Sequence, residues 1–69
     1  MMNKKALNAK MVLHGDTGET LSEALGISRQ TFSAKINEKN GAEFTQGEIS
    51  VIKTRYSLTP EEVDFIFFA

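Results

Sequence analysis

The chain has 69 residues, a formal net charge of −1 at pH 7, no cysteine and a single histidine. A chain of this length forms one small domain, here residues 1–69, with only about 60% of its unfolded surface buried on folding. The lack of cysteine excludes disulfides, iron–sulfur clusters and thiolate zinc sites. Because His14 alone cannot build a histidine-rich metal site, we expect neither a metal nor a cofactor.

The sequence also contains no pattern that indicates membrane insertion or export. The longest apolar run, residues 65–69, is far shorter than the roughly 20 residues that a membrane-spanning helix needs. No apolar stretch of signal-peptide length follows Lys4 and Lys5. With 41% hydrophobic residues, the chain has enough apolar material for a core. We therefore expect a folded cytoplasmic protein with no membrane partner.

The near-neutral net charge hides a gradient along the chain. Residues 1–40 contain six Lys or Arg and four Asp or Glu, a balance of +2, whereas residues 41–69 contain two and five, a balance of −3. A partner that bears phosphates should therefore meet the first forty residues. The excess of basic residues is small, however, and charge alone would not indicate a nucleic-acid-binding protein.

The first two predicted helices are separated by a glycine-rich turn. Apolar residues at three- and four-residue spacing predict a helix over residues 4–14, which the turn at residues 14–18 should end. Thr17 can cap a second helix over residues 18–25 by accepting a hydrogen bond from an amide of the first turn. Thr20 is an alternative cap, but capping by Thr17 is preferred because it gives the longer helix.

The later helix starts follow from capping chemistry. Ser28 precedes a helix over residues 29–37, with a hydrophobic pair on either side of the junction. Two capping boxes, in which a Glu follows the capping Thr by three residues, predict helices over residues 46–56 and 60–67. No alternating run of β-branched residues indicates a strand. The sequence therefore predicts an all-α protein of five short helices.

Residues 17–37 suggest a function. Here the turn Gly26-Ile27-Ser28 joins two predicted helices, and Gly26 can adopt the left-handed backbone that a tight helix end requires. Because Ser28 starts the second helix immediately, the two helices must cross at a steep angle. This arrangement is typical of a DNA-binding helix-turn-helix.

The same stretch resembles a known family. The pattern that resembles the helix-turn-helix of lambda-repressor-like (XRE, Cro-type) regulators is Leu21…Leu25-Gly26-Ile27-Ser28-Arg29…Thr31-Phe32-Ser33…Ile36-Asn37. The tail is similar to small prophage-encoded Cro-like regulators, and its pattern is Phe44-Thr45-Gln46…Glu48-Ile49…Leu58-Thr59…Glu62…Ile66-Phe67-Phe68. The resemblance covers residues 17–68. It implies a five-helix lambda-repressor-like domain that binds operator DNA as a Cro-like phage or prophage repressor in a bacterial cell, without a small-molecule ligand.

Three positions depart from the pattern of that family, and one of them is Lys35, before Ile36, near the end of the third predicted helix where an apolar residue is common. Gly18 stands where the family usually has a glutamine that clamps a phosphate, and Ser22 stands where a small alanine lets the two helices approach. The glycine removes one expected phosphate contact. The fold that the resemblance implies is not threatened by this loss.

Candidate DNA contacts follow from the faces of the third predicted helix. With Phe32 and Ile36 facing inward, the residues expected to contact base edges in the major groove are Arg29, Gln30, Ser33 and Ala34. Residues expected to contact phosphates are Thr17, Gly18, Ser28, Thr31, Lys35, Asn37, Lys39 and Asn40. For the last two, a plain turn is an equally good interpretation. Lys4 and Lys5 form either a DNA-binding arm or an exposed helix start.

The C-terminal run of phenylalanines allows two interpretations. One apolar stripe needs Val63, Ile66 and Phe67, so Phe65 and Phe68 point elsewhere. The tail either wraps into the core and buries all three phenylalanines or forms a two-fold interface through Phe65, Phe67 and Phe68. A homodimer would bind two half-sites about 34 Å apart on one face of double-stranded DNA.

The sequence contains no nucleophile–base pair, metal set or phosphate-binding glycine loop, so we expect no enzymatic activity. The alternative to a DNA-binding regulator is a small protein-interaction module, such as an antirepressor or an antitoxin-like adaptor. The acidic C-terminal half, the near-neutral charge and the glycine at position 18 favour this alternative.

Overall fold

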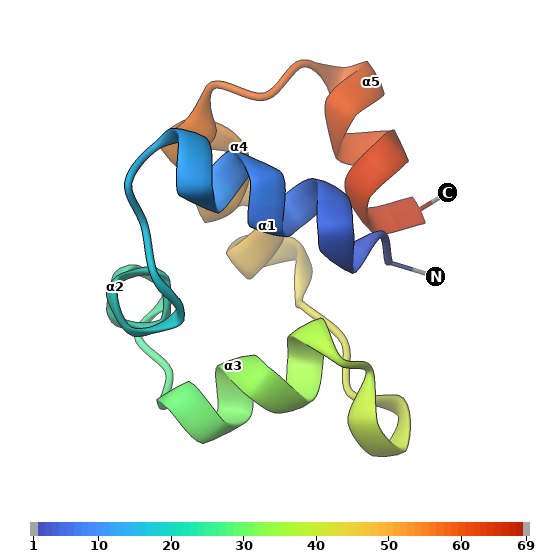
Figure 1. Cartoon of the computed structure of the whole chain (residues 1–69). Coiled ribbons are helices and arrows are strands. Elements are labelled where there is room, and N and C mark those ends of the chain that lie inside the picture. The colour runs from blue at the N-terminus through green and yellow to red at the C-terminus, as the bar shows by residue number, and fades with distance from the viewer. Residues whose placement is uncertain (1, 69) are drawn as a thin grey trace.

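The computed structural model describes residues 2–68, and within this range the chain forms five α-helices and no strand. The helices are α1 Lys4–Leu13, α2 Gly18–Leu25, α3 Arg29–Ile36, α4 Gln46–Tyr56 and α5 Pro60–Val63 (Figure 1). The prediction of an all-α protein is confirmed for these residues. None of the helices is long and apolar enough to cross a membrane.

Two shorter elements complete the fold. A 3₁₀ turn, Lys39–Gly41, follows α3, and a π-helical segment, Asp64–Phe68, continues α5. The sequence predicted one regular helix over residues 60–67 instead. In this segment Ile66 and Phe67 are buried in the core, as the predicted apolar stripe placed them.

The predicted helix starts are confirmed by their caps. The Thr17 hydroxyl accepts a hydrogen bond from the amide of Thr20 at 3.2 Å, and the Thr20 hydroxyl accepts one from the amide of Thr17 at 2.9 Å. Thr17 is therefore the cap of α2. The helices α4 and α5 begin with complete capping boxes, and Ser28 caps α3. Helices α1 and α3 each end one residue before the predicted boundary.

Side chains from α1 to α4, from the segments on either side of α4 and from the C-terminal segment form one hydrophobic core. Its buried members are Leu7, Met11, Leu21, Phe32, Ile36, Phe44, Ile49, Ile52, Tyr56, Leu58, Ile66 and Phe67. Within the core, the ring of Phe44 makes edge-on contacts with two others. Its centroid lies 5.8 Å from that of Phe32 and 6.0 Å from that of Phe67. The N-terminal segment lies beside the C-terminal one, and the amide of Asn3 donates to the carbonyl of Ile66 (Figure 1).

The junction between α2 and α3 is tight and well satisfied. Gly26 adopts a left-handed backbone conformation with φ of 72°. The amide of Ile27 donates to the carbonyl of Ser22 at 3.0 Å and the amide of Gly26 to that of Glu23 at 3.1 Å, the two bonds of a Schellman motif. In Figure 1, α2 is seen end-on while α3 lies across the view, so the two axes cross steeply. Ser22 is buried at this contact, and its hydroxyl donates to the carbonyl of Glu19.

Asp16 connects the turn between α1 and α2 to the end of α4. Its carboxylate, with a side chain only 7% exposed, accepts two hydrogen bonds from Arg55 and one each from Tyr56 and Thr20. The Arg55 hydrogen bond, with help from Tyr56 and Thr20, holds the pKa of Asp16 well below its usual range despite burial. The ring of His14 stacks on that of Tyr56 at 4.9 Å. The sequence analysis did not predict this cluster.

Replacement of Asp16 by Asn should lower the free energy of unfolding by about 1–3 kcal/mol, because hydrogen bonds to a charged acceptor are lost. The pKa of Asp16 is lower in the folded chain than in the unfolded chain, so its stabilising contribution is present above about pH 4 and is lost as the pH falls further. Urea unfolding at several pH values measures both effects. In Asp16→Asn the acid-dependent loss of stability should be smaller. The exposed carboxylate of Glu23 provides the control, and Glu23→Gln should resemble the wild type.

Candidate nucleic-acid interface

A shallow groove runs between α1, the start of α2 and one side of α3. Its volume is about 250 Å³. The residues that line it are Lys4, Asn8, Met11, Gly18, Arg29, Phe32, Ser33, Ile36 and Asn37. The lining contains two cations, Lys4 and Arg29, and no carboxylate. This groove therefore suits an anionic partner better than a cationic one.

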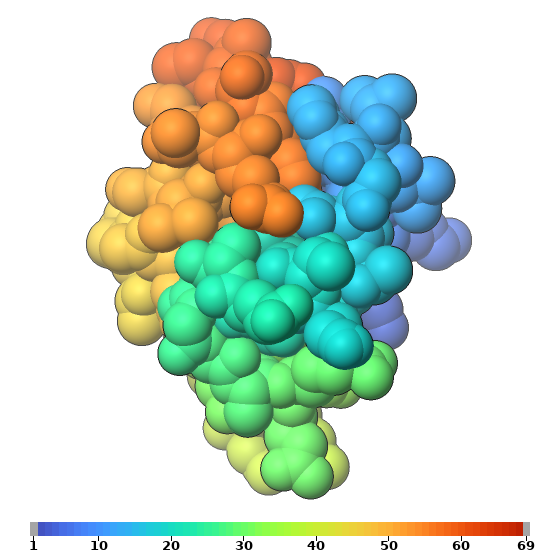
Figure 2. Space-filling model, turned by 90° about the vertical axis from the view of Figure 1, so that its left-hand side faces the viewer, coloured from blue at the N-terminus to red at the C-terminus, as the bar shows by residue number. Residues whose placement is uncertain are grey.

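The polar side of α3 faces solvent. Phe32 and Ile36 are buried, as predicted, whereas Arg29, Gln30 and Ser33 are exposed. In Figure 2, α3 and the turn that follows it form the lower end of the molecule. No hydrogen bond or ion pair engages the side chains of Arg29 and Gln30 within residues 2–68. These side chains are therefore available to a partner.

Ala34 lies at the edge of this polar side and is half-buried. Its methyl group is less accessible than the three exposed side chains, although the sequence analysis grouped all four as base contacts. Contact of any of them with a base stays a prediction. The exposed part of α3 nevertheless begins at Arg29, where the helix starts, as the sequence analysis expected.

The helix starts beside the groove contain half of the predicted phosphate contacts. Thr17 and Gly18 lie at the start of α2, and Ser28 and Thr31 at the start of α3. The Ser28 hydroxyl accepts from the Thr31 amide at 3.1 Å and donates to the Thr31 hydroxyl at 3.0 Å. Since the hydroxyls of Thr17 and Ser28 serve as caps, backbone amides of the first turns are the groups left to meet a phosphate.

The family resemblance implies a glutamine at the position of Gly18. A Cβ atom at this position would lie 3.6 Å from the Cε2 atom of Phe32, which is an ordinary van der Waals distance. The backbone of Gly18 has no positive φ. Neither space nor backbone conformation therefore requires glycine at the start of α2.

Lys35 was predicted to contact a phosphate, but its ammonium is paired inside the chain. It donates to both carboxylate oxygens of Glu48, at 2.7 and 2.8 Å, and the two side chains are only 16% and 13% exposed. Burial alone would raise the pKa of Glu48, but the hydrogen bonds from Lys35 and the Thr45 amide outweigh it and lower that pKa. Lys35 therefore connects α3 to α4, and its ammonium is not free to contact a phosphate as predicted.

Asn37 was also predicted to contact a phosphate, yet its polar atoms have partners in the chain. Its amide nitrogen donates to the carbonyl and hydroxyl oxygens of Ser33 at 2.9 and 3.3 Å. Its amide oxygen accepts from the ammonium of Lys4 at 2.5 Å. Lys39 and Asn40 lie in the exposed 3₁₀ turn after α3, outside the lining of the groove.

The contribution of α1 to this groove was not predicted from the sequence. Lys4 had two open interpretations and Asn8 had none, although both line the groove from α1, beside α3. Their spacing of four residues, which places both side chains on one face of a helix, was visible in the sequence. What the sequence did not show was that this face of α1 lies next to α3.

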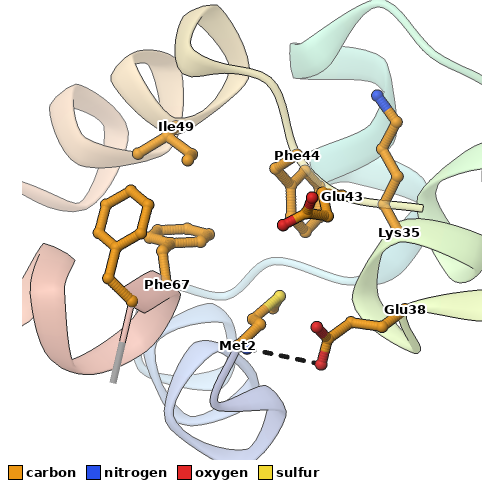
Figure 3. Close-up of a pocket in the computed structure, with 8 residues that line it drawn as sticks. Met2, Lys35, Glu38, Glu43, Phe44, Ile49 and Phe67 are labelled. Atoms are coloured by element: carbon orange, nitrogen blue, oxygen red, sulfur yellow. Dashed lines mark hydrogen bonds between the residues drawn. The ribbon is translucent and has the colours of Figure 1, made fainter. Parts of the chain in front are cut away.

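A second cavity lies on another side of α3, at the C-terminal end of the core. Phe44, Ile49 and Phe67 line it, and Glu38 and Glu43 lie at its edge (Figure 3). The amide of Met2 donates to Glu38 across it. A volume of about 30 Å³ has room for a water molecule but not for an organic ligand. Within residues 2–68, no three potential metal ligands lie close together.

The three phenylalanines at the C-terminus differ in exposure. Phe67 is buried in the core, so its predicted place in a dimer interface is wrong. Phe65 and Phe68 are 58% and 55% exposed, which also contradicts the interpretation that all three are buried. Phe65 borders a largely apolar groove of about 300 Å³ between α1 and the C-terminal segment, with Ala6 and Ala9 on the opposite side.

Replacement of Lys35 by Gln should lower the free energy of unfolding by about 1–2 kcal/mol, because Glu48 would lose its partner in a poorly solvated position. Urea unfolding measures this effect. The matched variant Lys39→Gln removes the same charge from an exposed turn and should change stability by less than about 0.5 kcal/mol. Equal stability of the two variants would contradict the structural role of Lys35.

Comparisons of the chain with protein-family models, with curated protein sequences and with solved structures found no match. The function is therefore inferred from the molecule itself. Its most informative features are an exposed polar side of α3 and an adjoining groove with cations from two helices.

Proposed function

We propose that this protein is a sequence-specific DNA-binding transcriptional regulator of the lambda-repressor-like, Cro-type class. In this proposal α2, the turn after it and α3 form a helix-turn-helix, and α3 enters the major groove. The observation that supports it most is the orientation of α3, which buries Phe32 and Ile36 and exposes Arg29, Gln30 and Ser33. The major groove admits one α-helix, and α3 lies at the surface of the molecule where a duplex can reach it (Figure 2).

Each exposed side chain of α3 has a natural counterpart on a base edge. The guanidinium of Arg29 can donate two hydrogen bonds to O6 and N7 of guanine. The amide of Gln30 can pair with N6 and N7 of adenine, and the hydroxyl of Ser33 can contact several base edges. Side chains near the start of a recognition helix reach bases most directly, and Arg29 and Gln30 are the first two residues of α3.

The surroundings of α3 supply groups that can bind phosphates. Thr17 and Gly18 lie at the start of α2, whose first-turn amides can meet a phosphate, and Gly18 lines the groove. Such contacts orient the protein on the duplex without reading its sequence. Lys35 is excluded from this set by its pairing with Glu48.

We further propose that two copies associate through their C-terminal segments. Phe65 and Phe68 expose aromatic surface, and Phe65 lies beside an apolar groove with Ala6 and Ala9 on its other side. Around a two-fold axis, each copy would offer both a phenylalanine and a groove to the other, which is the self-complementarity that a symmetric dimer requires. Such a dimer would place two copies of α3 on successive half-sites of one duplex.

A second candidate function is a protein-interaction module that binds no DNA. The balance of −3 over residues 41–69 and the exposed phenylalanines of the C-terminal segment favour it. Titration of a fluorescent duplex at two salt concentrations separates the candidates. Binding through phosphates weakens steeply as salt rises, whereas an adaptor would not bind the duplex at either concentration.

Selection of bound fragments from genomic DNA would identify an operator for the DNA-binding candidate. On that operator, Arg29→Ala should lose about 1–3 kcal/mol of discrimination against a duplex with the wrong base, because two hydrogen bonds to guanine disappear. Fluorescence anisotropy on the correct and altered duplexes measures this difference. Thermal unfolding should be nearly unchanged, since Arg29 is exposed.

The control for this experiment is Lys53→Ala, which removes one positive charge from an exposed position of α4 outside the groove. It should leave discrimination between the two duplexes intact. Equal binding of operator and random duplex by the wild type would contradict sequence-specific recognition. Equal discrimination by Arg29→Ala and the wild type would contradict the role of Arg29.

Phe65→Ala should shift the protein from dimer to monomer in sedimentation experiments, while its folding remains close to that of the wild type at low concentration. Phe67→Ala provides the contrast, because loss of a buried phenylalanine costs about 3–5 kcal/mol of stability. A wild-type chain that is monomeric at every concentration tested, with and without operator DNA, would refute the dimer.

A further inference from the structure

We infer that Lys4 binds a phosphate of the DNA backbone and that Asn37 holds its ammonium in position, so that α1 forms part of the DNA interface. This inference rests on the proposed function. It gives Lys4 a defined place in the interface, where the sequence left it either in a DNA-binding arm or at an exposed helix start. It also replaces the predicted phosphate contact of Asn37 by an indirect role through Lys4.

The first observation is the hydrogen-bonded chain at the end of α3. The amide nitrogen of Asn37 donates back to Ser33 at 2.9 and 3.3 Å, which fixes the direction of its amide oxygen. That oxygen accepts a hydrogen bond from the ammonium of Lys4 at 2.5 Å. The positive charge of Lys4 is therefore held over the last turn of α3 instead of moving freely on its long side chain.

The second observation is the number of free N–H donors that the ammonium of Lys4 retains. An ammonium has three N–H donors, and only the bond to Asn37 engages one within residues 2–68. Asn37 is neutral, so it orients the charge of Lys4 without cancelling it. By contrast, Lys10 and Lys35 are paired with carboxylates, of Glu62 and Glu48. Lys4 can therefore still offer a full charge and two donors to a phosphate.

The third observation is the position of Lys4 relative to the exposed face of α3. Lys4 and Arg29 line the same groove, near opposite ends of α3, and no carboxylate lies in the lining between them. The nine residues from Arg29 to Asn37 span about 12 Å along a helix axis, a distance comparable to the roughly 12 Å width of the major groove. Phosphates border that groove on both sides. When the starts of α2 and α3 lie near the phosphates on one side of the major groove, Lys4 lies near the phosphates on the other side.

Lys5 offers a matched control on the same helix. It has the same charge and an exposed side chain, and it directly follows Lys4, but it does not line the groove. Consecutive residues of a helix do not share a face. Any effect of net charge alone must therefore be equal for the two lysines, whereas a phosphate contact must distinguish them.

The experiment measures the affinity of the full chain for a fluorescent duplex of mixed sequence at a series of salt concentrations. Each phosphate contact contributes about 0.9 to the slope of log affinity against log salt concentration. Lys4→Gln should reduce the slope by about that amount, and Lys5→Gln should leave it unchanged. Circular dichroism and thermal unfolding of each variant show whether its fold is retained.

The role of Asn37 is tested by Asn37→Ala and by its combination with Lys4→Gln. Asn37→Ala should weaken binding at low salt, because the ammonium of Lys4 is no longer held in place. The double variant should bind no more weakly than Lys4→Gln alone, since Asn37 acts through Lys4. Additive losses would overturn the positioning role and would indicate that Asn37 contacts the DNA directly.

The failure of this inference and that of the proposed function are distinguishable. If the wild type binds the duplex in a salt-dependent manner and Lys4→Gln and Lys5→Gln have equal slopes, the phosphate contact of Lys4 is refuted while DNA binding stands. If the wild type binds no duplex even at low salt, both proposals are overturned. A reduced slope in Lys4→Gln alone supports both.

Discussion

The orientation of α3 depends on the burial of Phe32. Its ring lies under the start of α2, within 3.6 Å of the position of a Cβ atom on Gly18, and packs edge-on against Phe44. Together with Ile36, one turn further along, it prevents α3 from rotating about its axis. Because residues four apart share a face, this pair also decides which residues face solvent. The exposure of Arg29, Gln30 and Ser33 is thus a consequence of core packing.

The electrostatic character of the candidate interface arises from pairing elsewhere. Nearly equal numbers of acidic and basic residues would leave no distinct surface if they were mixed at random. Instead, Asp16 is neutralised by Arg55, Glu48 by Lys35 and Glu62 by Lys10. The Lys35–Glu48 and Lys10–Glu62 pairs each connect two helices, and the Arg55–Asp16 pair connects α4 to the turn before α2. The groove beside α3 retains its cations because its lining includes no carboxylate. A protein of net charge −1 can in this way present a basic groove.

The C-terminal segment combines a structural and an exposed part within five residues. Within this π-helical turn, Ile66 and Phe67 are buried in the core while Phe65 and Phe68 remain exposed. Burial of Ile66 and Phe67 stabilises the domain, and this contribution is important because so small a domain buries only a limited fraction of its surface. The exposed aromatic surface has no such benefit in a monomer, and this is the reason for proposing a second copy as its partner. The proposed dimer surface and the proposed DNA site both include residues of α1, but Phe65 lies outside the DNA site and Arg29 outside the dimer surface, so a substitution at either tests one proposal alone.

The sequence alone determined the helices, because caps and left-handed glycines act between neighbouring residues. Thr17, Ser28, Thr45 and Thr59 begin helices as predicted, and Gly26 ends α2. It also determined which face of α3 is buried, since a period of 3.6 residues is a local property.

Only the tertiary structure decided which charges remain available. Lys35 and Lys4 are both lysines on predicted helices, but Glu48 from α4 pairs with the first, while the neutral Asn37 from α3 orients the second. The same holds for Asp16, whose partners on α4 lie 39 and 40 residues away. Pairing between distant residues depends on how helices pack, and no local pattern in the sequence records the distance between two helix faces.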